Sequence, residues 1–499
     1  MSCVLPAHRE IIRRIHGGAR LRGTWRGMKD CANGESASRS LPRHEHPPTG
    51  IAYVIAEQHS RESCDSPCVA AGHWHAARAL PIALLTATVG ATSAAAQGLP
   101  RARPEEVGLS SVALARIAPA LRPYTDSGKL PGIVVAVARH GKLVHLEALG
   151  AMDIEHATPM RTDAVFRIYS MTKAVTGAAV AQLIERGKIR LDDPVSKYIP
   201  AFAQVQVFAG GSAANPVRRA PARPVTILHL LTHSSGLTYG AFGNTPVDSI
   251  YNGARVLNPA RTIAQFADSI AKLPLLFEPG SRWNYSMSMD VLGRVVEVAS
   301  GKTFDRYLEE ELFAPLGMRE TGFHATPAMA GRITTAYSPG PGGTLRPDAV
   351  LLGPDFRTEG KVFAGGQGLL STVADYLRFT QMLLNGGELD GQRVLKRETV
   401  AMMMRNHLPP ELTPITPPPL GNKRGYGQGF GGVVMLDSAA AGMPTSPGVY
   451  QWCGYAGTFF WVDRTADLIG MVWTQVYAGC PHPIETQLQK LVYGAITGG

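Results

Sequence analysis

The residues with the clearest chemical potential are a serine and a lysine three positions apart. Ser170-Met171-Thr172-Lys173 opens a stretch that predicts a long helix, directly after the apolar, extended segment 166–169. A serine hydroxyl is a poor nucleophile near neutral pH and needs a neighbouring base. Positions i and i+3 of a helix lie on one face, so Lys173 can take the serine proton. The positive end of the helix dipole would also favour an oxyanion at Ser170.

The S-x-x-K spacing is not specific by itself, because such a pattern recurs by chance about once in a chain of this length. The segment S-I-A-K at 269–272 also fits, but it ends a predicted helix before Pro274. A serine at that end of a helix faces the wrong pole of the dipole, so we expect Ser269 at the surface. For Ser170 taken alone, a nucleophile and a helix cap are equal alternatives.

The order of motifs along the chain resembles that of a known superfamily. Residues 279–301 (PGSRWNYSMSMDVLGRVVEVASG) predict a turn, an extended piece and a helix, and a strand led by Trp452 lies near the C-terminus. S-x-x-K, then Y-S-x before a helix, then a Trp- or Lys-led strand resembles the serine β-lactamases, penicillin-binding proteins and their esterase relatives. HLLTHSSGL at 229–237 and AGGQGLLSTVADYLRF at 364–379 are similar to two further segments of that superfamily. The resemblance spans about residues 105–495.

The resemblance implies that Tyr285 is a phenol standing against Ser170 and Lys173. A lysine ammonium favours the phenolate, so Tyr285 could accept the serine proton and later activate water. A tyrosine of the core is the alternative interpretation. The sequence does not decide which of Lys173 and Tyr285 is the formal base.

Two departures from the lactamase pattern bear on the substrate. The third position of the tyrosine motif, usually Asn, is Met287, whose thioether is a weak acceptor and cannot donate. The usual K-T-G of the C-terminal strand reads Trp452-Cys453-Gly454, so the cation that would pair with a substrate carboxylate is missing. Both changes resemble the family VIII carboxylesterases, and they imply a mouth suited to neutral acyl groups. By this resemblance the backbone N–H of Tyr455 is the second oxyanion donor, while Trp452 as a plain core residue remains the alternative.

The two ends of the segment 105–495 predict strands, and its middle predicts helices. Strand-like runs, rich in β-branched and aromatic residues, occur at 133–150 (with a hairpin turn at His140-Gly141), 429–436, 450–463 and 466–476. Helical periodicity occurs at 110–124, 170–187, 225–232, 261–272, 289–300, 304–312, 373–385 and 484–496. We therefore predict an α+β fold, in which an antiparallel β-sheet flanked by helices meets a helical domain at a cleft holding Ser170. Pro-rich segments 216–224 and 409–419 are expected as loops.

The N-terminal part of the chain differs from the rest. Residues 1–75 lack a sustained apolar period, and we expect them to be unstructured or a mis-annotated leader. Residues 76–96 have the basic, apolar and A-x-A parts of a secretory signal, with a loosely packed helix as the alternative. We expect translation to start near Val69 and the mature serine hydrolase domain to span 97–499. Its location would be periplasmic or secreted if this signal is used, and cytoplasmic otherwise.

Composition and charge favour a globular enzyme acting on small molecules. The 499 residues are 45% apolar, and the net charge of +10 comes without any run of five basic residues, so no nucleic-acid partner is expected. The apolar stretch of the signal-like segment is shorter than the ~20 residues of a membrane span, so no stable span is expected. The sequence contains neither G-x-S-x-G nor H-E-x-x-H, and Cys64 and Cys68 have no second ligand pair. We expect no metal and no organic cofactor.

Four further residues near the motifs are interpreted as structural. His229 and His233 lie in a matched segment without a triad-like partner, and we expect both to support the fold. Asp290 is expected to cap the helix that follows Tyr285. Cys453 is expected to be a small buried thiol.

Together these observations predict a serine carboxylesterase. It would hydrolyse short-chain esters through an acyl-enzyme on Ser170, and the shared acylation step would allow weak β-lactam hydrolysis. The alternatives are a class C-type β-lactamase or D-Ala peptidase, and a non-catalytic ligand-binding member of the fold. The expected partner is a small-molecule ester, and the oligomeric state is not readable from the sequence.

Overall fold

The computed structural model describes residues 98–256, 258, 260–348, 361–415, 417, 424–477 and 483–497. These residues belong to one unit that spans 93–499. The expectations for residues 1–75 and 76–96 lie outside the described residues. Within the described ranges, no helix combines the length and the hydropathy that a membrane crossing requires.

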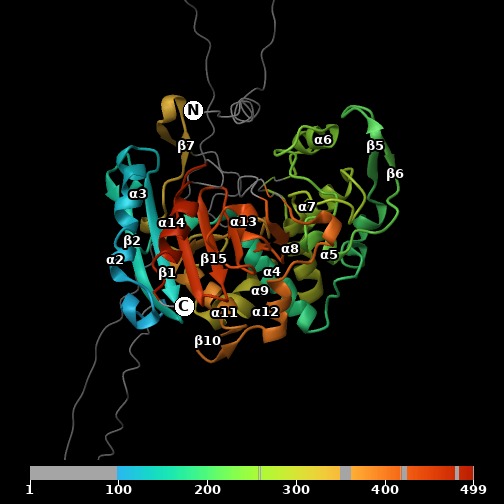
Figure 1. The fold of residues 1–499 in the computed structure, drawn as a ribbon. Coiled ribbons are helices and arrows are strands. Elements are labelled where there is room, and N and C mark those ends of the chain that lie inside the picture. The colour runs from blue at the N-terminus through green and yellow to red at the C-terminus, as the bar shows by residue number, and fades with distance from the viewer. Residues whose placement is uncertain are drawn as a thin grey trace, which may run out of the picture. The chain divides into compact units, whose positions relative to one another are not determined.

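An eight-stranded antiparallel sheet joins strands from both ends of this unit (Figure 1). Its strands, in spatial order, are β12 (Tyr426–Gln428), β13 (Val433–Met435), β14 (Tyr450–Cys453), β15 (Thr458–Asp463), β16 (Leu468–Trp473), β1 (Gly132–Arg139), β2 (Lys142–Asp153) and β3 (Thr158–Pro159). The N-terminal and C-terminal groups meet where β1 pairs with β16, from Val134 opposite Trp473 to Arg139 opposite Leu468. The predicted fold class, α+β with one antiparallel sheet, is confirmed.

The turn between β1 and β2 lies at the predicted dipeptide. His140 and Gly141 have φ of 51° and 72°. Positive φ at both central residues is the geometry of a type I′ turn, whose twist matches that of the flanking strands. This tight hairpin sets the register of the two longest strands.

The helices follow the apolar periodicity of the middle of the chain. They are α2 (Ser111–Leu114), α3 (Ile117–Asp126), α4 (Thr172–Glu185), α5 (Ile227–Leu231), α6 (Pro246–Ala254), α7 (Ile263–Ala271), α8 (Ser288–Ser300), α9 (Phe304–Leu308), α10 (Ala314–Leu316), α11 (Val373–Leu384), α12 (Arg397–Met403), α13 (Ser438–Ala441) and α14 (Pro483–Tyr493). Short strand pairs lie outside the main sheet: β4 (Val165–Arg167) with β9 (Leu370–Thr372), β5 (Val207–Gly211) with β6 (Pro216–Arg219), β7 (Tyr337–Pro339) with β8 (Leu345–Pro347), and β10 (Glu388–Leu389) with β11 (Gln392–Arg393).

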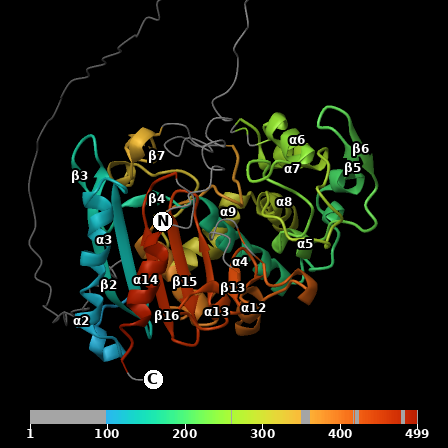
Figure 2. The same cartoon turned by 45° about the horizontal axis from the view of Figure 1, so that its top comes forward.

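Helices cover both faces of the sheet. Figure 2 shows α3 and α14 along one face, where Gln489 of α14 donates to Gln451 of β14 at 3.3 Å. Tyr376 of α11 packs on Phe460 of β15, with ring centroids 5.2 Å apart. Gln451 pairs with Trp461, the neighbour of Phe460, and neighbouring residues of a strand point to opposite faces. Helix α11 therefore packs on the face opposite to α14.

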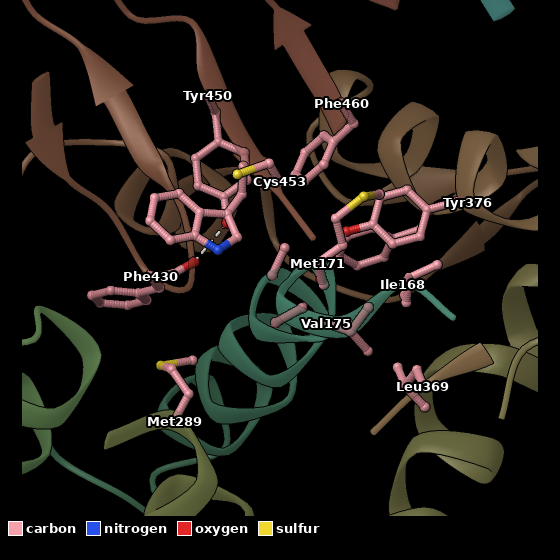
Figure 3. Packing of buried hydrophobic residues seen from close by; sticks show 14 of the residues in the cluster. Ile168, Met171, Val175, Met289, Leu369, Tyr376, Phe430, Tyr450, Cys453 and Phe460 are labelled. Atoms are coloured by element: carbon pink, nitrogen blue, oxygen red, sulfur yellow. Dashed lines mark hydrogen bonds between the residues drawn. The ribbon is translucent and has the colours of Figure 1, made fainter. Parts of the chain in front are cut away.

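Helix α4 passes through the interior and carries the predicted lysine. Twelve of its fourteen residues, Thr172 to Leu183, are buried. Figure 3 shows Val175 of α4 among the apolar side chains that surround the start of the helix. A Cβ on Gly177 would lie 2.6 Å from the carbonyl oxygen of Phe430, so only glycine permits this approach. The close packing fixes α4 relative to the C-terminal half of the chain.

Two local expectations were wrong. The helix expected at 110–124 is divided into α2 and α3. Pro119 has no N–H to donate to the carbonyl of Ala115, so a continuous helix would lose a bond there and the chain restarts instead. The loop expected at 216–224 begins as a strand, because β6 pairs with β5 in an antiparallel hairpin. Its proline, Pro216, stands at the end of the strand, where a missing N–H is tolerated.

Candidate active site

Ser170 lies in a 3₁₀ turn, Tyr169–Met171, that leads directly into α4. The preceding residue, Tyr169, has φ of 43°, a left-handed conformation that is unfavourable for a bulky side chain. Its phenol is held by a 2.5 Å hydrogen bond with the hydroxyl of Tyr477. Ser170 itself is half-buried.

Lys173 is fully buried beneath Ser170. Its Nζ donates to Ser170 Oγ at 3.1 Å, to the hydroxyl of Tyr239 at 2.9 Å and to the carbonyl of Gly366 at 2.6 Å. An ammonium has three N–H donors, so all of them are used. These three contacts hold the Lys173 side chain in one position beside the serine oxygen.

Tyr285 approaches Ser170 from the loop before α8. Its hydroxyl donates to Ser170 Oγ at 2.8 Å, and Lys173 Nζ lies 4.9 Å from the centroid of its ring. The loop is held by Asn284, whose N–H donates to the carbonyl of His233 at 2.8 Å. The structure thus brings Ser170, Lys173 and Tyr285 together around one oxygen atom.

His233 packs beside this phenol as a neutral ring. Its ring centroid lies 5.0 Å from that of Tyr285, and its Nδ1 lies 3.2 Å from Ser286 Oγ. Burial, followed by the charge of Lys173, holds the pKa of His233 well below its ordinary value. His229, the other histidine of the segment, lies in the capping box of α5, where its Nδ1 accepts from the N–H of Thr226.

The sequence did not predict that Tyr239 and Asp290 lie near Lys173. Tyr239 accepts a hydrogen bond from Lys173, as described above, and burial followed by the charge of Asp290 raises its pKa well above the ordinary value. Asp290 was expected to cap α8, and this is wrong. The N-cap is Met287, and Asp290 is fully buried and accepts from the N–H of Gly366 at 2.8 Å. Burial raises the pKa of Asp290, and the charge of Lys173 opposes this rise.

A sequence signal for both residues existed. Tyr239 follows the matched segment 229–237 by two positions, and Asp290 lies in the segment 279–301 that carries the resemblance. In the structure both lie close to Lys173, Asp290 through the peptide of Gly366.

The end of β14 packs closely against the segment before Ser170. A Cβ on Gly454 would lie 2.3 Å from the carbonyl oxygen of Ile168, so glycine is required for this approach. In the part of the chain that the structure describes, the backbone N–H of Tyr455, which follows the end of β14, donates to no other backbone group.

The other predicted site residues, Trp452, Met287 and Cys453, are all buried. Trp452 is buried, with its ring centroid 5.5 Å from that of Tyr285, and its indole N–H has no partner among the described residues. Met287 is buried at the start of α8. Cys453 is also buried, at the end of β14, and it is labelled in Figure 3. Cys453 is disulfide-bonded, so the expectation of a free thiol was wrong. One disulfide leaves no spacing pattern in a sequence, which is why it was missed.

The second S-x-x-K segment has no comparable surroundings. Ser269 is half-buried in the last turn of α7, and its hydroxyl donates to the carbonyl of Gln265 at 2.7 Å. Among the described residues, no group of three or more His, Cys, Asp or Glu side chains is arranged to hold a metal ion.

Comparison with known proteins agrees with this geometry. The Beta-lactamase family matches residues 117–491. Protein Rv1367c of Mycobacterium tuberculosis is 35% identical, over 70% of this chain and 86% of its own length. Esterase EstB of Burkholderia gladioli is 33% identical, over 73% and 91%. Among solved structures, EstCE1, described as a hydrolase with promiscuous acyltransferase activity, is 28% identical with a TM-score of 0.65, covering 77% of this chain and 99% of its own.

The family match covers well over half of the chain, and the relatives include esterases and acyltransferases. The chain therefore belongs to the β-lactamase family, and it is a serine hydrolase of the β-lactamase and penicillin-binding-protein fold.

Proposed function

We propose that this protein is a carboxylesterase that hydrolyses short-chain esters through an acyl-enzyme on Ser170. The observation that carries the proposal is the environment of one oxygen atom, Ser170 Oγ, with Lys173 Nζ at 3.1 Å and the Tyr285 hydroxyl at 2.8 Å. A serine is activated by a base within hydrogen-bond distance, and both groups are within that distance.

In the proposed first half-reaction, Ser170 Oγ attacks the ester carbonyl carbon and its proton passes to the phenolate form of Tyr285. The three N–H groups of Lys173 are directed to Ser170, Tyr239 and Gly366, so Lys173 acts mainly as a positive charge that stabilises the phenolate. The negative carbonyl oxygen binds the backbone amides of Ser170 and Tyr455. When the C–O bond breaks, Tyr285 returns the proton to the alkoxide, and the alcohol leaves.

In the second half-reaction, water replaces the alcohol and the same groups act in reverse. Tyr285 takes a proton from the water as its oxygen attacks the acyl carbon. The tetrahedral intermediate collapses, Ser170 Oγ receives the proton, and the carboxylic acid is released. No redox step or external reactant besides water is needed.

Two features of the chain, Trp452 and Met287, support a neutral ester as the substrate. Trp452 occupies the position where the resemblance expects a cation, and its ring packs against Tyr285. Met287 offers no hydrogen-bond donor. A neutral ester fits these surroundings better than a substrate that carries a carboxylate, because a buried unpaired charge is costly.

A p-nitrophenyl ester series from acetate to octanoate, run on wild type and on Ser170→Ala, tests the proposal. We expect the highest kcat/KM for short acyl chains and a loss of activity in the variant. Nitrocefin and a D-Ala peptide are the comparison substrates. A higher kcat/KM for either of them would support a β-lactamase or D-peptidase instead, and no turnover of any substrate would support a ligand-binding protein.

Acyl transfer to an alcohol is a second candidate activity of the same acyl-enzyme. The similarity to EstCE1 favours it, as do the aromatic rings of Trp452 and Tyr239 around Tyr285, which favour an organic acceptor. Adding 1-butanol to p-nitrophenyl butyrate hydrolysis would show it as butyl butyrate, measured by gas chromatography. Butyric acid as the sole product would exclude this activity for that acceptor.

A further inference from the structure

Phe242 is an exposed aromatic side chain placed directly beside the catalytic phenol. Its exposed fraction is 49%, and it is the one aromatic residue among the exposed large apolar residues of the described ranges. Its ring centroid lies 5.8 Å from that of Tyr285 and 5.6 Å from that of Tyr239. One side of Phe242 therefore packs on the site, while the other side is open to solvent or to a bound molecule.

The loop that carries Phe242 is held by a buried carboxylate. Asp248, in the first turn of α6, accepts from the hydroxyl of Thr238 at 2.7 Å and from the hydroxyl of Thr245 at 2.7 Å. A Cβ on Gly243 would lie 2.2 Å from the same carboxylate, so the chain next to Phe242 packs directly against it. Asp248 is 2% exposed, and both of its oxygens are bonded. The position of Phe242 is thus defined by the fold on both sides of the residue.

The chemistry of the site identifies the part of the substrate that Phe242 meets. During acylation the carbonyl oxygen lies at the amides of Ser170 and Tyr455, next to β14. The alcohol oxygen must lie within hydrogen-bond distance of the group that returns its proton, which is the Tyr285 hydroxyl. The alcohol portion of the ester therefore lies on the Tyr285 side of Ser170, where the Phe242 ring is exposed.

We propose that Phe242 forms a wall of the leaving-alcohol subsite and selects esters of apolar alcohols, aryl alcohols above all. This inference rests on the proposed ester hydrolysis. Apolar contact and ring stacking with the alcohol group are made before the C–O bond breaks. They are lost once the alcohol leaves, so the acyl portion and the hydrolysis of the acyl-enzyme do not involve Phe242.

The test compares two ester series on wild type, Phe242→Ala and Phe242→Leu. In the first series the acyl group stays butyryl and the alcohol is methanol, 1-butanol, cyclohexanol or benzyl alcohol. In the second, p-nitrophenol stays constant and the acyl chain grows from acetyl to octanoyl. Val217→Ala is the matched control, because Val217 is an exposed apolar residue (57%) on β6.

We expect Phe242→Ala to lower the ratio of kcat/KM for benzyl butyrate to that for methyl butyrate about fivefold, equivalent to ~1 kcal/mol. Phe242→Leu should fall between this variant and wild type, because it keeps an apolar contact. The ratios along the acyl series should stay unchanged, and Val217→Ala should match wild type in both series.

An unchanged alcohol ratio in folded Phe242→Ala would overturn the inference, and so would a change confined to the acyl series. Failure of the proposed ester hydrolysis gives a different result, since wild type would then turn over none of the esters, or Ser170→Ala would remain active. Thermal unfolding of each variant shows whether it is folded.

Discussion

Replacing Tyr285 by phenylalanine removes one oxygen and keeps the ring. The hydroxyl donates to Ser170 Oγ at 2.8 Å. The ring is 5% exposed, and its centroid lies 5.0 Å from that of His233 and 5.5 Å from that of Trp452. Phenylalanine fills the same space and makes the same ring contacts. We therefore expect a stability loss of about 1 kcal/mol, the contribution of one hydrogen bond.

The effect on catalysis should be much larger than the effect on stability. Proton transfer by a positioned side chain contributes about 10²–10⁴-fold to a rate. We expect Lys173 to stay 3.1 Å from Ser170 Oγ in the variant, as in wild type. Its other two donors are bound to Tyr239 and Gly366, so it cannot move into the place of the phenol. We expect kcat to fall by about 10²–10⁴-fold, or ~2.7–5.5 kcal/mol in the activation free energy.

The assay measures kcat and KM for p-nitrophenyl butyrate, together with the unfolding temperature. Tyr239→Phe is the matched control, because it makes the same chemical change at a phenol that contacts Lys173 and has no hydrogen bond to Ser170. Its kcat should fall less than that of Tyr285→Phe. The account would be refuted by a folded Tyr285→Phe with kcat within tenfold of wild type, or by an equal loss in both variants.

Three further changes test how the site is supported. Gly454→Ala places a Cβ 2.3 Å from the carbonyl oxygen of Ile168. The free energy of unfolding should therefore fall by about 1–3 kcal/mol, and kcat should fall as well. Wild-type values for both quantities would contradict the close approach of β14. His229→Gln should remove part of the pH dependence of stability. Burial lowers the pKa of His229 to about 4, so between pH 6.5 and 4 the unfolded chain takes up a proton that the folded chain does not. Wild type should therefore lose up to ~3 kcal/mol of unfolding free energy over this range. Glutamine still accepts from the N–H of Thr226, so urea unfolding of this variant should change less between pH 7 and 4.5; an identical change would contradict the reasoning. Asp290→Asn should lower kcat and change the pH dependence of stability. Burial raises the pKa of Asp290, so wild type loses stability as the pH rises through that value, and the variant should lose less between pH 3 and pH 7. A larger loss in the variant than in wild type would show that the carboxylate stabilises the fold.

Features with a local or periodic signal could be predicted from the sequence. Ser170 and Lys173 are three residues apart, so one helical turn brings them together, and the structure has the hydrogen bond between them. The β-rich segments at 133–150 and 450–476 predicted one sheet from both ends, which the β1–β16 pair confirms. Alternation and helical period survive folding because they describe which face of each element is buried.

Features that depend on contacts between distant segments were not predictable in the same way. Asp290 has a capping position in sequence, but in the folded chain the peptide of Gly366 lies beside it. The strand at 216–219 exists because a second segment pairs with it, and the disulfide of Cys453 needs a partner from elsewhere in the chain. Phe242 shows no motif, and its place beside Tyr285 follows from the way the loop before α6 folds.

The most direct measurement is the position of a covalent label. The protein is incubated with a fluorophosphonate, which reacts with an activated serine, and the modified peptide is identified by mass spectrometry. Ser269, in the same S-x-x-K spacing at the end of α7, is the internal control. We predict a label on Ser170, none on Ser269, and none on the Ser170→Ala variant. A label on Ser269 or on another residue, with Ser170 unmodified, would contradict the central claim.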